Sequence, residues 1–178
     1  ETLGILYQQA GEWMGGDFDF NKIELSGAKY FPLWQDSLDR YFVLALSGSI
    51  RRAKETGSLT GVPYSERYFI GGQGTLRGFD FRGVGPRNLS GFPLGGEAAW
   101  YGTAEIRFPL ISTRVRGSVA ETEYVRGAIF VDAGSAGPSI SSLGPTRISV
   151  GVGARIRIPF MPQAAISLDF GFPIQSEP

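Results

Sequence analysis

Cysteine and histidine are both absent from the 178 residues of the chain. Without cysteine there is no disulfide framework and no thiolate metal site. Without histidine there is no base of the Ser-His-Asp kind, and the commonest ligand of transition metals is missing. These absences argue against Ser-His-Asp catalysis and thiolate metal sites, and we expect a protein that is not an enzyme and has no catalytic residues, cofactor or metal ion.

Excess charge of one sign and long apolar runs are missing as well. The 17 Lys and Arg residues balance 17 Asp and Glu residues, whereas nucleic-acid binders usually carry a basic excess. We therefore expect no nucleic-acid partner. The longest apolar run, residues 41–46, is far shorter than the roughly 18 residues of a membrane-spanning helix. A membrane β-barrel also lacks such runs, because only alternate side chains face lipid.

The chain does contain a regular alternation of apolar and polar side chains. In the clearest segment, Ile148, Val150 and Val152 alternate with Arg147 and small residues. Successive side chains of a strand point to opposite faces, so this pattern predicts β-strands. Similar patterns predict about seven strands, at residues 3–13, 18–33, 42–51, 97–110, 124–134, 147–160 and 164–174. The alternation slips near Gly27, which indicates a β-bulge there.

The predicted strands are long, about 10–14 residues, where soluble strands average about 5–6 and tilted membrane strands need about 9–11. Their length favours an all-β fold, an antiparallel segment of a transmembrane β-barrel. A soluble lipocalin-type barrel is the alternative, with its apolar face inside and its charged face in water. Alternation alone leaves both open.

Residues 52–96 form a long connection without a clear strand, and 26 glycines in the chain make it rich in turns. Outer-membrane barrels place long loops on one side and short turns on the other. Gly72-x-Gly74 is not a dinucleotide fingerprint, because Arg77 stands where the third glycine would fall. Long loops inside compact domains are usually functional.

This loop carries a motif. Gly71 and Gly72 precede residues 76–79, which read Leu-Arg-Gly-Phe, and a Gly-Pro-Arg follows at 85–87. Downstream, Glu105 lies in Ala-Glu-Ile-Arg-Phe-Pro-Leu and Asp132 in Phe-Val-Asp-Ala-Gly. Together these segments resemble the barrel of the BamA-type outer-membrane assembly factors, whose relatives include TamA, the two-partner secretion transporters and the chloroplast import channel.

The resemblance implies that residues 1–178 are one domain, the C-terminal portion of a sixteen-stranded outer-membrane barrel that follows periplasmic domains. The early strands and a final strand with a terminal aromatic residue would lie outside this sequence. It implies a location in the outer membrane of a Gram-negative bacterium or of an organelle of bacterial origin. The implied function is to fold and insert β-barrel proteins, or, in the transporter branches, to move a partner across the membrane.

The implied partners are outer-membrane lipid, unfolded outer-membrane protein clients, the periplasmic domains of the same protein and accessory lipoproteins. A plain porin is a further alternative, since a ring of charges could line a pore. The side chains that could supply this ring are Glu105, Arg107, Arg126, Asp132, Arg155 and Arg157.

Strand parity makes one prediction about the site. Glu105 and Asp132 both fall on the polar faces of their strands, and a buried carboxylate needs a cationic partner. We therefore expect the loop to fold into the barrel and set Arg77 against Glu105, Asp132 or both. Gly78 would let the loop tip turn, and Phe79 would pack on the inner wall.

Overall fold

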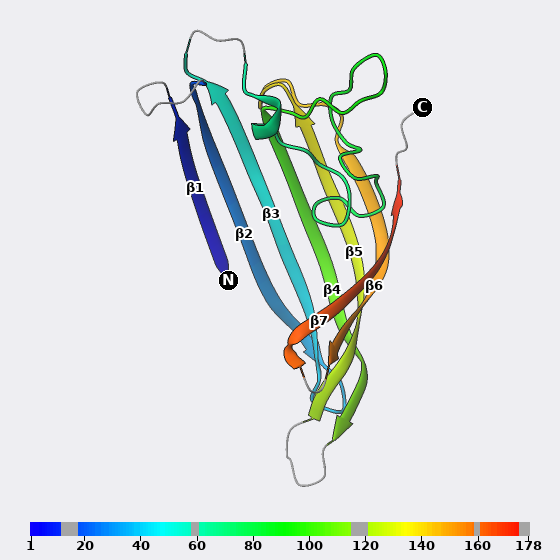
Figure 1. Cartoon of the computed structure of the whole chain (residues 1–178). Helices are drawn as coiled ribbons and strands as arrows, with labels where there is room; N and C mark the ends of the chain where they lie inside the picture. Colours follow the sequence, from blue (N-terminus) through cyan, green and yellow to red (C-terminus); the bar gives the residue numbers. More distant parts are fainter. Residues whose placement is uncertain (12–17, 58–60, 115–120, 159–160, 175–178) are drawn as a thin grey trace.

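The computed structural model describes residues 1–11, 18–57, 61–114, 121–158 and 161–174. It confirms the prediction of an antiparallel all-β fold with seven strands in one sheet, in the order β1 to β7 along the chain. The sheet does not close on itself (Figure 1). The strands are β1 (Thr2–Ala10), β2 (Phe20–Gln35), β3 (Tyr41–Glu55), β4 (Ala98–Arg114), β5 (Glu121–Gly137), β6 (Arg147–Ile158) and β7 (Met161–Pro173). Within these residues, no helix is long and apolar enough to cross a membrane.

The strand boundaries differ slightly from those expected. The strand expected at residues 3–13 ends at Ala10, and residues 12–17 lie outside the described part of the chain. Residues 159–160, at the end of the strand expected at 147–160, also lie outside it. The third strand is longer than expected and continues to Glu55, because it stays paired with β2 as far as Phe20. The long connection therefore begins after residue 55 and not at 52.

The β-bulge predicted at Gly27 is wrong. Gly27 pairs in register with Leu3 on one side and Gly48 on the other. The register between β2 and β3 shifts instead between Pro32 and Trp34. Proline has no N–H to donate to the ladder and is tolerated at such irregularities, so the bulge follows Pro32.

The two faces of the sheet have opposite character. On one face, apolar side chains lie open: Val152 of β6 is 53% exposed and Phe170 of β7 is 67% exposed. On the other face the long loop covers charged side chains, and Asp132 is 0% exposed. A lipocalin-type barrel would have the reverse arrangement. An apolar outer band over a polar interior is the pattern of a transmembrane barrel.

The long loop packs against the upper part of the sheet, in front of β4 to β6 in Figure 1. It begins with a short 3-10 helix at Tyr64–Glu66. Its apolar residues Ile70, Leu76 and Val84 are buried against Ala99 of β4 and Ala136 of β5. Isolated bridges fix the path of the loop, among them Tyr68 with Gly96 and Ile70 with Val84. The loop is thus an ordered layer over one face of the sheet.

Candidate functional site

Arg77 lies at the centre of the buried charges, between the loop and the sheet. Its guanidinium donates through Nε and Nη2 to the two carboxylate oxygens of Asp132, both at 2.8 Å. Its Nη1 donates to Oε2 of Glu105, also at 2.8 Å. The backbone N–H of Arg77 adds a fourth contact, to Oδ2 of Asp132 at 3.1 Å. One side chain of the loop therefore bridges the neighbouring strands β4 and β5.

The sheet positions the two carboxylates for this contact. Glu105 pairs across the β4–β5 ladder with Phe130, and Asp132 pairs with Thr103, so both carboxylates lie on the same face. The ring of Phe130 lies beneath the guanidinium, with Cζ of Arg77 at 3.3 Å from the ring centroid. A planar guanidinium stacks well on an aromatic face while it donates in its own plane. The ring and the carboxylates thus select arginine and disfavour lysine.

Glu105 is shared among three arginines. Besides Arg77 it accepts from Nε of Arg107 at 2.7 Å and from Nη2 of Arg155 at 2.7 Å. Asp132 differs, since Arg77 is the one cation within 4 Å of it among the described residues. Removal of the loop would leave Glu105 paired by arginines of the sheet, whereas Asp132 would lose its partner.

A tight turn of the loop holds Arg77 in place. The N–H of Gly72 donates to the carbonyl of Leu76, and the N–H of Gly71 donates to the hydroxyl of Thr75. The side chain of Leu76 is completely buried in the apolar cluster between loop and sheet. Leu76 anchors the chain immediately before Arg77. This anchor fixes the position of the Arg77 backbone and keeps its guanidinium close to the carboxylates.

Gly78 and Phe79 follow directly. Gly78 has a φ of +90°, a conformation that residues with a side chain rarely adopt. It turns the chain immediately after Arg77. Phe79 is partly buried and packs against the apolar cluster under the loop. The structure therefore places all of the expected motif residues, Gly71, Gly72, Leu76, Arg77, Gly78 and Phe79, on or beside the turn that seats Arg77.

The charges of the site compensate one another. Burial alone would lower the pKa of Arg77, but the hydrogen bonds that it donates to Asp132 and Glu105 raise that pKa above its usual value. Arg77 therefore stays charged at any physiological pH. In the described ranges of the chain, no group of three or more His, Cys, Asp or Glu side chains is arranged to hold a metal ion. The arrangement can clamp the loop to the sheet.

Sequence reasoning missed part of this cluster. Asp169 of β7 accepts from Arg155 of β6 at 2.6 Å, and its second oxygen lies 3.5 Å from Nη1 of Arg77. Both residues alternate onto the polar faces of their strands, and this parity was the available signal. Alternation gives the face of each side chain but not the curvature that brings β7 under the loop tip.

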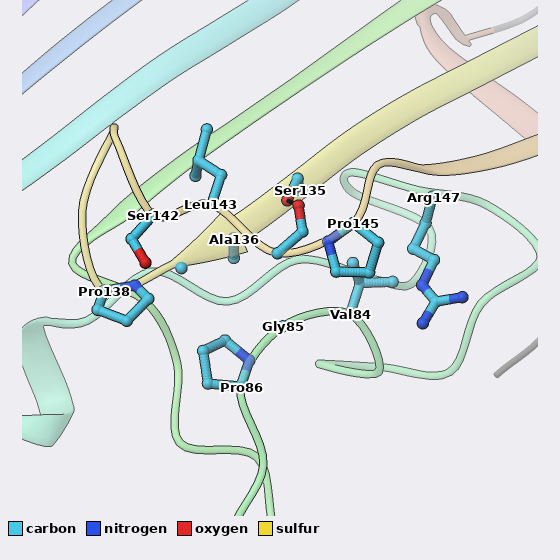
Figure 2. A pocket seen from close by; sticks show the side chains of 12 residues that line it. Val84, Gly85, Pro86, Ser135, Ala136, Pro138, Ser142, Leu143, Pro145 and Arg147 are labelled. Atoms are coloured by element: carbon cyan, nitrogen blue, oxygen red, sulfur yellow. Dashed lines mark hydrogen bonds between the residues drawn. The ribbon is translucent and has the colours of Figure 1, made fainter. Parts of the chain in front are cut away.

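Several hollows adjoin the loop, and two of them differ clearly in character. One of about 360 Å³ is polar and lies beside the cluster, lined by Arg77, Glu105 and Arg155 among others. The other, of about 290 Å³, lies at the end of the sheet (Figure 2). There Val84 and Pro86 of the loop face Ala136 of β5 and Pro145 of the β5–β6 connection. None of the clustered carboxylates lines the second hollow. It lies between the edge of the loop and the β5–β6 hairpin.

Comparison with known proteins identifies the family. The model of the Omp85 superfamily domain matches residues 2–178. The chain belongs to the Omp85 superfamily. Because the chain is a member of this superfamily, its seven-stranded sheet is part of an outer-membrane β-barrel.

Several relatives are similar to this Omp85 chain. Outer membrane protein assembly factor BamA of Neisseria meningitidis serogroup B is 28% identical over 122 residues, which are 65% of this chain and 14% of that protein. SAM50-like protein CG7639 of Drosophila melanogaster is 26% identical over 178 residues, 99% of this chain and 38% of that protein. The sorting and assembly machinery component 50 homolog of Mus musculus is 29% identical over 130 residues, 72% of this chain and 25% of that protein.

A solved structure is similar in fold. The crystal structure of BamA from Haemophilus ducreyi lacking POTRA domains 1-3 superposes with a TM-score of 0.76 at 23% identity, over 98% of this chain and 35% of that one. The Omp85 chain therefore spans well under half the length of each of these relatives.

Proposed function

We propose that this Omp85 chain is the C-terminal barrel part of a non-catalytic outer-membrane machine that folds and inserts β-barrel proteins into the membrane. The names of two relatives, an outer membrane protein assembly factor and a sorting and assembly machinery component, support this role. Its partners would be membrane lipid, unfolded outer-membrane protein clients, the periplasmic domains of the same protein and accessory lipoproteins. No cofactor takes part.

The observation that carries the proposal is the bridge from Arg77 to Glu105 and Asp132. A barrel whose seam opens for client strands loses ladder hydrogen bonds while it is open. A loop clamped across β4 and β5 by three hydrogen bonds of 2.8 Å braces the remaining wall. The role of Arg77 is thus structural, and the clamp needs the planar fork of donors.

A plain porin fits this geometry less well. Of the charges that could line a pore, Glu105 and Asp132 are engaged by Arg77, and Arg107 and Arg155 are engaged by Glu105. Under the loop, Glu105 is 3% exposed and Asp132 is 0% exposed, so neither carboxylate faces open water. A transporter of the same family would use the same clamp, and only the cargo would differ.

The test is to replace Arg77 in the full-length protein and to measure client assembly. Cells that depend on the Arg77→Ala variant should assemble outer-membrane proteins more slowly, with the variant itself still present in the membrane. Arg77→Lys should also be impaired, because one ammonium cannot reproduce the fork. Arg87→Ala is the matched control, since exposed Arg87 of the same loop donates to the carbonyls of Gly83 and Gly91. Normal assembly by Arg77→Ala would refute the proposed role, and loss of export of one partner alone would favour the transporter branch.

A further inference from the structure

The tip of the loop also touches β7, whose Asp169 lies 3.5 Å from Nη1 of Arg77. Gly78 of the loop and Gly171 of β7 lie with their backbones in direct contact. A Cβ atom built on Gly78 would lie 2.6 Å from the carbonyl carbon of Gly171, and one built on Gly171 would lie 2.7 Å from the backbone nitrogen of Gly78. Real Cβ atoms do not approach backbone this closely, so both positions require glycine.

A charged pair lies next to this contact. Asp169 is two residues before Gly171 on the same face of β7, and its side chain is 8% exposed. It accepts from Nη1 of Arg155 at 2.6 Å, while Nη2 of Arg155 donates to Glu105 at 2.7 Å. Arg155 therefore links the carboxylate of β7 to the carboxylate that Arg77 holds on β4.

The two faces of β7 have different surroundings. In the described sheet β7 is hydrogen-bonded to β6, and the loop tip lies over its inner face. Its outer side chains are open, with Phe170 and Phe172 both more than 60% exposed. The contacts on its inner face therefore come from the loop tip and from Arg155.

We propose that Arg155, Asp169 and Gly171 are positioning residues that couple the seat of the loop to strand β7. With the loop seated, the Gly78–Gly171 contact and the Arg155–Asp169 pair hold β7 against the loop. With the loop withdrawn, β7 loses this support and becomes more mobile. Coupling of this kind is reciprocal, so a change in β7 must loosen the loop by the same free energy by which a change in the loop loosens β7.

The functional consequence of this coupling rests on the proposed role in client assembly. The coupling itself does not depend on that role. The coupling follows from the contacts between the loop and β7, so it is tested by a measurement that does not depend on client assembly.

The experiment is hydrogen–deuterium exchange of the full-length protein in lipid nanodiscs, followed in loop residues 70–79 and in β7 residues 166–173. The backbone N–H of Arg77 donates to Asp132, so its exchange reports directly whether the loop is seated. Three variants are compared with the native protein: Gly171→Ala, which inserts a methyl group into the contact; Asp169→Asn, which adds no atoms; and Arg77→Ala, which releases the loop.

Each of the two β7 variants has a matched control. Gly102→Ala places a methyl group on β4 where the nearest atom is the carbonyl oxygen of Ser47 at 3.7 Å. Asp36→Asn removes an ion pair of 2.7 Å with Arg40 in the β2–β3 turn, away from the loop. Both controls should leave exchange of the loop and of β7 at the native rate.

Asp169→Asn should speed exchange of the loop about tenfold, as expected for one lost charge-assisted hydrogen bond. Gly171→Ala should speed it at least as much, because its methyl group would lie 2.7 Å from the backbone nitrogen of Gly78. Arg77→Ala should in turn speed exchange of β7. Exchange in β2 and β3 should stay native. A β7 variant that leaves the loop unchanged overturns the coupling, and so does equal acceleration in every strand. If both segments exchange faster while the same variants assemble clients normally, the coupling stands and the proposed assembly role fails.

Discussion

Removal of the Arg77 side chain should destabilise the protein through Asp132 rather than through Glu105. In Arg77→Ala, Glu105 keeps Arg107 and Arg155, each at 2.7 Å. Asp132 loses both side-chain donors, and its own side chain is 0% exposed. Breaking a buried pair by removing one partner costs about 3–5 kcal/mol, because an uncompensated charge is left behind. We expect a loss in the free energy of unfolding at the lower end of that range, about 3 kcal/mol, since the cavity left by Arg77 admits water.

The assay is equilibrium urea unfolding of the full-length protein in lipid vesicles, with Asp132→Asn and the double variant Arg77→Ala/Asp132→Asn measured alongside. In the double variant the uncompensated buried charge at position 132 is gone, so about 2 kcal/mol of the loss should be recovered as coupling energy. Glu105→Gln in the Arg77→Ala background should recover much less, because Glu105 is still paired. If the Asp132 and Glu105 double variants behave alike, the reasoning that separates the two carboxylates is refuted.

Three further predictions concern the sheet. The isolated 178-residue chain should give no compact, heat-modifiable monomer in detergent, because β1 and β7 expose unpaired backbone groups; a folded monomer on a semi-native gel would contradict this. Val152→Arg on the open apolar face of the full-length protein should cost about 2–4 kcal/mol in bilayer stability, with Val152→Leu near neutral as its control; equal stabilities would place that face away from lipid. The hydrogen bond from the Arg40 side chain lowers the pKa of Asp36 below its ordinary value of 3.8. The stabilisation that ionised Asp36 gives to the β2–β3 turn is therefore fully present above that value and is lost as the pH falls through the lowered pKa. An NMR titration of Asp36 that is unchanged by Arg40→Ala would contradict it.

The alternation of side chains predicts most of the fold because a strand has a period of two that survives irregular composition. It fails at Gly27, where Ser26, Gly27 and Ala28 are all small and carry no information about which face is apolar. The register shift occurs beside Pro32, and a missing backbone donor is a better sign of a bulge than a gap in hydrophobicity.

The site is predictable to the extent that it depends on parity. Glu105 and Asp132 are assigned to one face by counting along β4 and β5, and the motif supplies Arg77 as a cation. The contact of Arg77 with Phe130, and the place of Asp169 below Arg77 at 3.5 Å, depend on the curvature of the sheet and the path of the loop. Neither the curvature of the sheet nor the path of the loop is encoded in a local sequence pattern.

The unequal pairing of the two carboxylates has a consequence for loop movement. With the loop in place, Asp132 is shielded from water and depends on Arg77. When the whole loop withdraws, the cover over Asp132 leaves with it, and water can solvate the carboxylate. Glu105 stays paired to the arginines of the sheet in either case. Release of the intact loop therefore costs less than deletion of the Arg77 side chain beneath a seated loop, because hydration replaces part of what the guanidinium supplied. A clamp built in this way is stable when closed and still able to open.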